Sequence, residues 1–490
     1  MSADVDVLIV GAGPAGLMLA TELALARVRA TVIDQEPGPS PVSRGFTLNA
    51  RSVELLDRRG LAGRFLREGP TVRTSTFAGL TTPLDLSTMD TGHPYALGIA
   101  QARVQELLAD RARELGVPIR YGHRLTALRQ DATGVTATRE TDPDITALYV
   151  VGCDGAHSTV RKAAGIAFPG TPSTRFALVG DVSAPVPADL PFGPTVTARG
   201  SVFAIPRPGY VRIITADPDV PVEPDVPVEP DVPVARESGT ETAGPVTLAR
   251  LQAAVDRVLG WHLPLSEPRW LSRFGDGARL ADRFVAGRVI LAGDAAHIHP
   301  PAGAVGVNVA IDDAVNLGWK LAATVHGHAP DGLLASYHTE RHAVGERLLR
   351  NTRAQALLGE TDTRTAPLRA LVAELGTLPA VNTHLAEMVT GIDTRYPMPH
   401  VTPHPLVGRL APNWTLTCGI SISEILAEGR GALLDLGGCP PTVDGAERRL
   451  VRYTGQCLDC PDLPGLLIRP DGHVAWAGGA GLDAALATWF

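Results

Sequence analysis

The first 34 residues change from an apolar run to a helical pattern and then to a second apolar run. Residues 5–10 are almost entirely apolar, as in a parallel strand that is buried on both faces. Residues 14–27 carry leucines and alanines at helical spacing, and residues 30–34 form a second strand that ends in an acid. This pattern predicts a strand–helix–strand unit of an α/β domain.

Three glycines separate the first strand from the helix and indicate a dinucleotide-binding turn. Gly11 allows the tight turn, Gly13 lets the backbone approach a pyrophosphate, and Gly16 lets the helix pack closely on the strand. The phosphates would lie at the helix N-terminus, where free N–H groups favour anions. Any tight strand-to-helix turn could use such glycines, but Asp34 supplies the acid that holds a ribose hydroxyl in dinucleotide sites.

Two later segments repeat the pattern of a buried strand followed by a turn. Residues 148–152 lead to Asp154, and residues 287–293 lead to Asp294. Ligands bind outside the carboxyl ends of the strands in open α/β sheets. Both aspartates are therefore candidate ligands, and Asp294 is a candidate partner of a ribityl hydroxyl.

Two other features are candidates for contact with a cofactor. A long helix is expected from about residue 307 through Lys320, and its N-terminus at residues 306–308 would favour the negative charge that gathers on a reduced flavin. Arg44 lies in a Pro/Gly/Ser loop after the second strand. It is either an ordinary loop cation or a ligand of a flavin or of a nicotinamide-nucleotide phosphate.

Between residues 172 and 275 apolar and polar residues alternate, which predicts an antiparallel sheet with one covered face. The alternation is clearest at 175–182 and 200–215, and residues 246–260 have the apolar stripe of a helix. The proline-rich tandem run at 218–233 predicts an extended, mobile acidic loop without a direct catalytic role. Residues 400–490 follow a helical segment and have the pattern of a small α/β unit with an Asp-Gly hairpin.

Composition excludes several classes of protein. The chain of 490 residues is 44% hydrophobic and 20% charged, as expected for a globular enzyme of two or three domains. A net charge of −8 argues against a nucleic-acid partner. No uninterrupted apolar run reaches the ~18 residues that cross a bilayer, and the first residues lack a secretory signal. We therefore expect no membrane partner and a cytoplasmic protein, whose five cysteines are reduced.

Two groups of potential metal ligands have weak signals. Cys457 and Cys460 form a C-x-x-C pair, but the prolines that follow indicate a loop rather than the strand-to-helix position of a redox motif. A structural role is favoured over metal or redox chemistry. His297 and His299 are two residues apart in a loop without a third ligand nearby, so we expect no metal site.

Three motifs occur in an order that is specific to one group of flavoenzymes. They are the glycine turn at 11–16, the Asp-Gly-x-x-Ser-x-Val-Arg motif at 154–161, and Gly-Asp-Ala-Ala-His at 293–297 with the Pro/Gly loop at 301–308. Together they resemble the single-component FAD-dependent aromatic hydroxylases of the p-hydroxybenzoate and phenol hydroxylase type. The whole chain is similar to the actinobacterial branch that acts on polyketide antibiotics, which includes angucycline hydroxylases and rifampicin monooxygenase. Further similar segments are 43–45, 77–80, 151–155, 269–275, 316–320 and 469–476.

The resemblance implies an α/β fold in three parts. A Rossmann-like FAD-binding domain would span residues 1–171 and continue, with a helical segment, over 276–395. A substrate-binding domain with an antiparallel sheet would be inserted at 172–275, and a thioredoxin-like domain would occupy 396–490. The resemblance also implies that NAD(P)H and dioxygen are used to hydroxylate a small polyketide-type molecule, with the cofactor carrying the oxygen chemistry. The protein would be a monomer or a homodimer.

The same resemblance assigns ligand roles by motif position. No protein nucleophile is required, so no catalytic side chain is assigned. The candidates on the substrate side are Phe77, Phe203 and Arg212. The residues expected to hold FAD are Gly11, Gly13, Ala15, Gly16, Asp34, Gln35, Arg44, Gln101, Asp154, Asp294, Pro301, Gly303, Gly306, Val307 and Asn308.

One position departs from the pattern of the family. Val305 stands where a polar residue is usual beneath the flavin, and a branched apolar side chain there would restrict flavin movement or the approach of oxygen. Some relatives retain FAD as a structural element and form decalin rings by [4+2] addition. A redox-neutral cyclase of polyketide antibiotic biosynthesis is therefore the alternative to a hydroxylase. A halogenase is disfavoured because the chain has no Trp-x-Trp-x-Ile-Pro motif.

Overall fold

The computed structural model describes residues 3–185, 193–197, 199–216, 246–300, 302–360, 363–417, 419–437 and 449–490. The proline-rich run at 218–233 and Pro301 lie outside the described residues, so the predictions made for them are not examined by the structure. None of the described helices has both the length and the apolar character that a membrane crossing requires.

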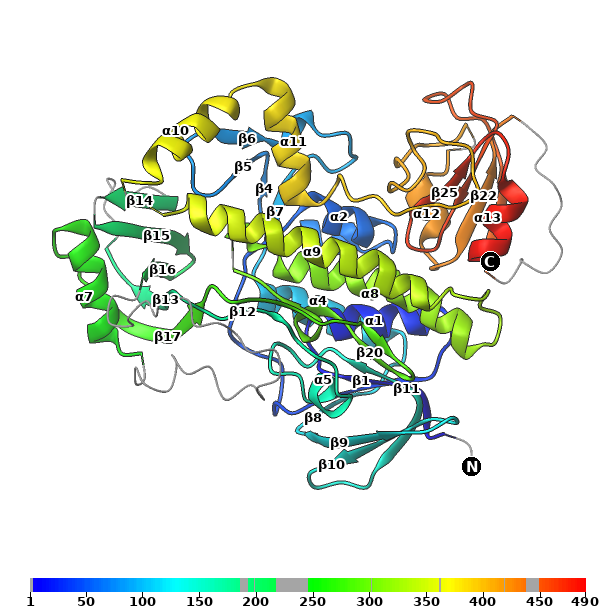
Figure 1. Cartoon of the computed structure of the whole chain (residues 1–490), viewed down its shortest axis with the longest axis horizontal. Coiled ribbons are helices and arrows are strands. Elements are labelled where there is room, and N and C mark those ends of the chain that lie inside the picture. The colour runs from blue at the N-terminus through cyan, green and yellow to red at the C-terminus, as the bar shows by residue number, and fades with distance from the viewer. Residues whose placement is uncertain are drawn as a thin grey trace.

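A mostly parallel sheet forms the centre of the molecule (Figure 1). Five parallel strands lie in the order β20-β11-β1-β2-β8, and the pairs Val10–Gly152 and Val10–Ile33 place three strand ends at one edge. The turns that follow β1 and β11 therefore lie side by side. The strands are β1 (Val5–Val10), β2 (Ala30–Asp34), β8 (Ile119–Tyr121), β11 (Ile145–Gly152) and β20 (Val289–Leu291), with β9 (Leu125–Gln130), β10 (Val135–Arg139) and β19 (Val285–Ala286) added antiparallel.

Helices cover the central sheet and bury its apolar residues in one core. The aliphatic side chains of β1, β2, β11 and β20 pack with those of α1, α4 and α8. The first predicted helix ends earlier than expected, at Leu25, because Arg27 takes a left-handed conformation with a φ of 60°. The elements are α1 (Pro14–Leu25), α2 (Ala50–Asp57), α3 (Ala62–Leu66), α4 (Gln101–Glu114), α5 (Thr159–Ala163), α8 (Gly306–Val325), α9 (Ala335–Leu358), α10 (Ala366–Leu375) and α11 (Pro379–Thr390).

Short elements connect the core to the other parts of the chain. Small sheets form from β3 (Thr47–Leu48), β4 (Thr71–Val72) and β7 (Ala96–Gly98), from β5 (Thr74–Thr76) and β6 (Pro83–Asp85), and from β12 (Gly170–Thr171), β18 (Ala278–Leu280) and β21 (His297–Ile298). Single turns of 3₁₀-helix are η1 (Leu86–Thr88), η2 (Gly293–Ala295) and η3 (Ala302–Ala304).

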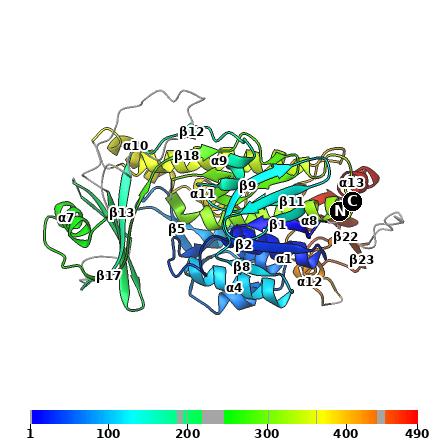
Figure 2. The same cartoon turned by 90° about the horizontal axis from the view of Figure 1, so that it is seen from below.

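The antiparallel sheet expected between 172 and 275 is present. Its five strands lie in the order β14-β15-β16-β13-β17, and every neighbouring pair is antiparallel. One face packs on α7 (Leu248–Leu259), which lies on the outer side of the sheet (Figure 2), so the other face turns toward the rest of the molecule. The strands are β13 (Phe176–Ser183), β14 (Gly193–Thr197), β15 (Gly200–Arg207), β16 (Tyr210–Ala216) and β17 (Ser266–Gly275).

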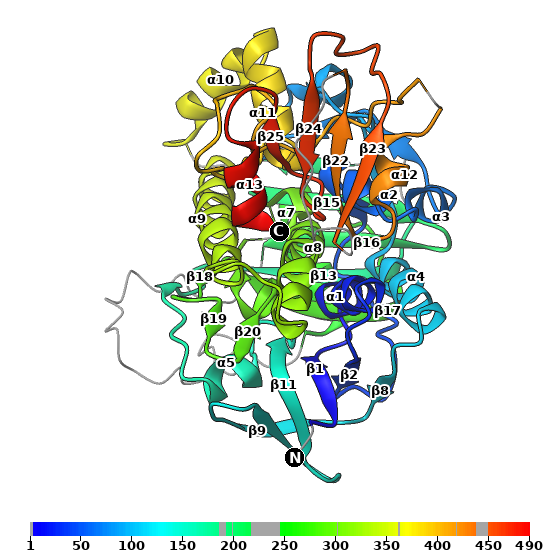
Figure 3. The ribbon, with the colours of Figure 1, turned by 90° about the vertical axis from the view of Figure 1, so that its right-hand side faces the viewer.

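The C-terminal part is a four-stranded sheet between two helices (Figure 3). Alternate residues of its central strands pack toward α12 and toward α13. The predicted Asp-Gly hairpin is the β24–β25 pair, and β22 and β23 are parallel. The elements are α12 (Ile422–Leu426), β22 (Gly431–Asp435), β23 (Leu450–Thr454), β24 (Gly465–Ile468), β25 (Val474–Ala477) and α13 (Leu482–Trp489).

Candidate functional site

Three turns at the carboxyl edge of the central sheet lie against one another. Gly11 has a φ of 109°, and a Cβ atom there would lie 2.3 Å from the carbonyl oxygen of Cys153, just before Asp154. A Cβ atom at Gly293 would lie 3.1 Å from the Cβ atom of Ala15. The glycine turn therefore contacts both the Asp154 turn and the Asp294 turn. Segments that are far apart in the sequence form one site.

The N-terminus of α1 has the open space that a pyrophosphate needs. Gly13 is the N-cap, and no side chain caps the free N–H groups of the first turn. A Cβ atom at Gly13 would meet no atom within 4 Å, whereas one at Gly16 would lie 2.0 Å from the carbonyl oxygen of Gly11. Gly16 is therefore required by packing. Gly13 leaves room beside unsatisfied N–H groups, which suits a bound anion.

Asp34 joins the second strand to the glycine turn. Its carboxylate accepts the N–H of Ala12 at 2.6 Å and the N–H of Glu36 at 2.9 Å. A carboxylate has about four acceptor positions, so two remain for a ribose hydroxyl. Gln35 is exposed beside it. Gln105 of α4 also contacts this turn, because its side-chain amide donates to the Ala12 carbonyl oxygen at 2.7 Å. Gln105 was not predicted, because the sequence pattern does not distinguish it from the other polar residues of α4.

Arg44 lies on a loop that is fixed to the start of α4. The N–H of Gln101 donates to the Gly45 carbonyl oxygen at 2.9 Å, and the N–H of Ala102 donates to the Ser43 hydroxyl at 3.0 Å. The side chain of Arg44 is exposed. The loop therefore has a fixed backbone, and its arginine is free to reach a ligand.

Asp154 orders its own turn. The Ser158 hydroxyl donates to Oδ1 at 2.5 Å and the N–H of Val160 donates to Oδ2 at 3.1 Å, while burial raises the pKa of Asp154 above its ordinary value. Asp294 is half-buried in η2. Asp154 is half-buried as well, but both of its carboxylate oxygens already accept hydrogen bonds within its own turn.

The N-terminus of α8 offers backbone groups rather than the Asn308 side chain. The Oδ1 atom of Asn308 accepts the N–H of Asn49 at 2.8 Å and the hydroxyl of Ser52 at 2.7 Å, and its amide donates to the Thr47 carbonyl oxygen at 3.2 Å. Asn308 therefore fixes the start of α2. Gly306 and Val307 form the first turn of α8, and Gly303 precedes it with a φ of 73°.

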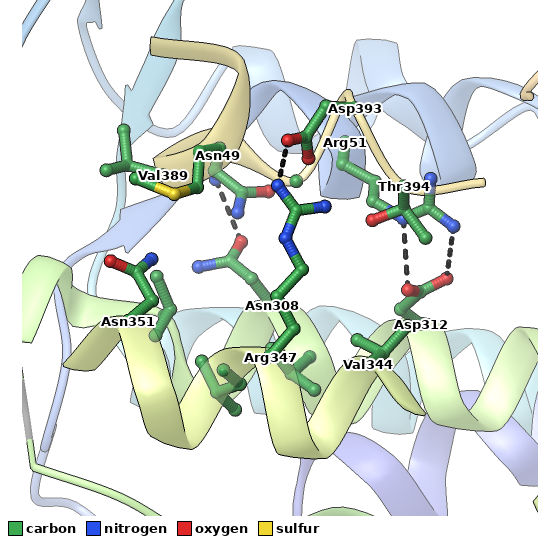
Figure 4. A pocket seen from close by; sticks show the side chains of 15 residues that line it. Asn49, Arg51, Asn308, Asp312, Val344, Arg347, Asn351, Val389, Asp393 and Thr394 are labelled. Carbon is green, nitrogen blue, oxygen red and sulfur yellow. Dashed lines mark hydrogen bonds and ion pairs between the residues drawn. The ribbon is translucent and has the colours of Figure 1, made fainter. Parts of the chain in front are cut away.

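Val305 lies on the wall of a pocket of about 70 Å³ between α8, α9 and the end of α11 (Figure 4). Its apolar wall continues with Val309, Val344 and Leu348. The polar wall includes Asn49, Asn308, Asn351 and two ion pairs, Arg51 with Asp312 and Arg347 with Asp393. The residue that departs from the family pattern therefore faces a space beside the start of α8.

The three candidates on the substrate side lie in two places. Arg212 is buried and paired with Asp181 at 2.7 and 2.8 Å, and its guanidinium lies 4.5 Å from the Phe46 ring centre. Phe203 lies on the face of β15 opposite the residues that pack on α7. Phe77 is buried in a separate apolar cluster with the end of α11. In this structure Arg212 joins the inserted sheet to the loop at Phe46, so its hydrogen bonds are largely used within the protein.

His297 and His299 each lie against an oxygen atom of the protein. The Nε2 atom of His297 lies 2.7 Å from Asp313, and the Nδ1 atom of His299 lies 2.7 Å from the Pro300 carbonyl oxygen. Within the part of the chain that the structure describes, no group of three His, Cys, Asp or Glu side chains is arranged to hold a metal ion.

Comparison with known proteins agrees with this arrangement. Residues 4–352 match the family model of the FAD binding domain, and residues 404–490 match that of the aromatic-ring hydroxylase C-terminal region. The chain belongs to the FAD-dependent aromatic-ring hydroxylases. The resemblance drawn from the three motifs is confirmed.

The relatives match this hydroxylase over nearly its whole length. A 12-dehydrotetracycline 5-monooxygenase/anhydrotetracycline 6-monooxygenase of Streptomyces rimosus is 42% identical and covers 99% of this chain and 98% of its own. A rifampicin monooxygenase of Streptomyces venezuelae is 42% identical and covers 96% of this chain and 95% of its own. The solved structure of the S. rimosus anhydrotetracycline hydroxylase has a TM-score of 0.89 at 41% identity, with 99% of each chain covered. A dialkyldecalin synthase of Streptomyces rugosporus is 40% identical and covers 99% of this chain and 98% of its own.

The hydroxylase also contains a buried charge cluster that sequence reasoning missed. The turn between β24 and β25 inserts Arg469 and Asp471 between α8 and α9. The Arg469 guanidinium bonds Glu340 of α9 at 2.6 and 2.9 Å and also pairs with Asp471. The Nζ atom of Lys320 lies 2.7 Å from the same Glu340 carboxylate. The available signal was the placement of Arg469, Asp471 and His473 at alternate positions in the Asp-Gly hairpin.

A second branch of the cluster leads from the C-terminal turn toward the glycine turns. Arg51 of α2 lies 3.1 Å from Nε2 of His473 and pairs with Asp312 at 3.0 Å. Arg341 pairs with both Asp312 and Asp313. Asp313 in turn accepts the N–H of Gly293 at 2.9 Å, next to Asp294. The C-terminal part therefore supports the Gly293–Asp294 turn through a chain of buried contacts.

The free energy of unfolding of this hydroxylase is expected to fall as the pH is lowered from about 4.5 toward 2. Burial opposes ionisation of Glu340 and Asp313, but Arg469 and Lys320 beside Glu340, and Arg341 and His297 beside Asp313, lower both pKa values to about 2 from 4.5 and 3.8. In this pH range the unfolded chain therefore binds more protons than the native state, so lowering the pH favours unfolding.

Each of the two groups contributes a slope of up to about 1.4 kcal/mol per pH unit. Urea unfolding of the apoprotein between about pH 5 and 3 measures this slope, and Glu340→Gln should reduce it. An unchanged slope in Glu340→Gln would show that this carboxyl does not resist protonation.

Proposed function

We propose that this hydroxylase uses FAD, NAD(P)H and dioxygen to hydroxylate a phenol-like ring of a small polyketide-type molecule. The observation that carries the proposal is the meeting of the Gly11, Asp154 and Asp294 turns beside the open N-terminus of α1. Relatives that act on tetracycline-type and rifampicin substrates, and that match nearly the whole chain, support the substrate class.

The residues present fit FAD. The free N–H groups at the N-terminus of α1, beside Gly13, would hold the pyrophosphate, Asp34 the ribose, and Asp294 a ribityl hydroxyl. The N–H groups of Gly306 and Val307 would stabilise negative charge at the ring system. Bound FAD supplies hydride acceptance from NAD(P)H and the activation of dioxygen, which no side chain can provide.

The protein's own contribution is to position the reactants and to exclude water. The inner face of the inserted sheet, with Phe203, would cover one side of the reaction space, and Arg212 with Asp181 would hold that sheet against the loop at Phe46. Exposed Arg44 would bind a phosphate of the nicotinamide nucleotide or of FAD. The exclusion of water from this space would suppress side reactions.

The second candidate function is a redox-neutral cyclisation with FAD in a structural role. Two observations favour it: the full-length similarity to a dialkyldecalin synthase, and the apolar Val305 at the start of α8. Hydroxylation is preferred because the tetracycline and rifampicin monooxygenases are at least as similar to this chain.

Reduction of the purified FAD-loaded protein by NADPH distinguishes the two functions. We expect the visible flavin absorbance to disappear without oxygen, faster in the presence of a hydroxylated anthraquinone or tetracyclic phenol than in its absence. Admission of air should restore the colour and yield a product heavier by one oxygen atom. A flavin that NADPH does not reduce, but without which a polyene substrate does not cyclise, would favour the cyclase instead.

The division into parts is proposed with the same boundaries. The FAD-binding domain would occupy 1–171 and 276–395, the substrate-binding domain 172–275 and the thioredoxin-like domain 396–490. The strand order β23-β22-β24-β25, with one parallel and two antiparallel pairs and helices on both faces, supports the last assignment. We place the protein in the cytoplasm, where NAD(P)H is available.

A further inference from the structure

A tight loop after β23 carries two cysteines. Leu458 and Asp459 form a turn that returns the chain from Cys457 to Cys460. Neighbouring backbone bonds hold both ends: the N–H of Thr417 donates to the residue before Cys457 at 2.9 Å, and the Cys460 carbonyl oxygen accepts the N–H of Leu463 at 3.1 Å. A four-residue turn brings its end Cα atoms within about 7 Å, close to the ~4.4–6.8 Å that a disulfide spans.

The two cysteines lie at the two ends of this turn but differ in exposure. Both are free thiols. Cys457 is buried in the apolar cluster beneath α12, whereas Cys460 is partly exposed between exposed Asp459 and exposed Pro461. Burial, Cys457 and Asp459 all raise the pKa of the Cys460 thiol. At neutral pH Cys460 is therefore mostly a protonated thiol, which reacts slowly.

We propose that Cys457 and Cys460 are a modification site, at which hydrogen peroxide forms a reversible intramolecular disulfide. The small fraction of Cys460 that is deprotonated attacks a peroxide oxygen, the O–O bond breaks, and a sulfenic acid and hydroxide result. The sulfur of Cys457 then attacks the Cys460 sulfur, the S–O bond breaks, and water leaves with the Cys457 proton. In total two thiols and one hydrogen peroxide give one disulfide and two waters.

This site is independent of the flavin chemistry. The pair lies in the C-terminal part, and neither cysteine belongs to the three turns that form the candidate flavin site. The loop position that argued against a redox motif in the sequence does not prevent the reaction. It requires two thiols that a tight turn holds near each other and one route to solvent, and it does not need the helix N-terminus of a disulfide oxidoreductase.

Mass spectrometry of the full-length FAD-loaded protein treated with hydrogen peroxide tests the proposal. Cleavage after Arg452 releases residues 453–490, which contain Cys457 and Cys460 and no other cysteine. We expect the mass of this fragment to fall by two hydrogen atoms and both cysteines to resist alkylation. Reduction with dithiothreitol should restore the mass and allow both cysteines to be alkylated. A fragment that remains fully alkylated, that gains oxygen atoms instead, or that is linked to Cys418 or Cys439 would overturn the proposal.

Matched variants separate the two steps. Cys457→Ser should leave Cys460 as a sulfenic acid that dimedone labels, and Cys460→Ser should abolish the disulfide. Cys153→Ser is the control, because Cys153 is buried in the central core and should not affect the linkage. Loss of the linkage in Cys153→Ser would contradict the proposal. If a variant fails to fold, the wild-type mass measurement decides alone.

Discussion

Replacing Gly16 with alanine is expected to weaken FAD binding strongly and to destabilise the apoprotein, whereas Gly13→Ala should weaken FAD binding alone. A Cβ atom at Gly16 would lie 2.0 Å from a backbone oxygen of the tight turn, which cannot move aside. Such overpacking costs about 1–3 kcal/mol or more. At Gly13 the φ of −76° suits alanine and the space is open, so the added methyl group would occupy only the room expected for the pyrophosphate.

Thermal unfolding of the two apoproteins and titration with FAD test this contrast. The melting temperature of Gly13→Ala should stay near that of the wild type, while its FAD affinity falls by about 100-fold or more, equivalent to about 2.7 kcal/mol. Gly16→Ala should melt several degrees lower. Wild-type affinity in Gly13→Ala would mean that the pyrophosphate does not bind at α1.

Replacing Glu340 with alanine is expected to lower the free energy of unfolding by about 3–5 kcal/mol. Its carboxylate faces two buried cations, Lys320 at 2.7 Å and Arg469 at 2.6 Å. Burial already lowers the pKa of Lys320 to about 8, although the Glu340 charge opposes this shift. Without the carboxylate, both cations would lie in a low-dielectric environment, Arg469 paired with Asp471 and Lys320 donating to the neutral Asn316 amide.

Urea unfolding followed by tryptophan fluorescence measures this loss. Arg469 lies 5.3 Å from the Trp319 ring centre and 4.4 Å from that of Trp489, so two of the six tryptophans report on the cluster. Glu346→Ala on the exposed face of the same helix is the control and should stay within about 0.5 kcal/mol of the wild type. Equal stability of the two variants would show that the cluster contributes little.

Local pattern was sufficient for the elements that build the candidate flavin site. The continuous apolar runs that end at Val10 and Gly152 predicted parallel strands, and the structure pairs these two residues. Gly11 and Gly16 are required for the reasons that the motif gave, a positive φ and a close approach. These inferences succeeded because they depend on neighbouring residues and on steric limits of the backbone.

Inferences that depend on distant residues were harder. The role of Asn308 as a partner of Asn49 and Ser52 links positions more than 250 residues apart, which no periodic pattern reveals. Arg212 was selected as a charge near the substrate, but its partner Asp181 on the adjacent strand becomes visible only with the register of the sheet. Strand β9 was missed because exposed polar residues interrupt its alternation.

The insertion of the β24–β25 turn into the body of the protein has a consequence for synthesis. Arg51, Asp312 and Arg341 leave the ribosome long before His473 and the rest of that turn. Until the last residues emerge, the nascent chain holds these charged side chains around an unfilled gap between α2, α8 and α9. Sequence-distant contacts of this kind form late and expose the chain to misassembly. Premature stop codons near residue 465 should therefore yield aggregated protein rather than a shorter flavoprotein.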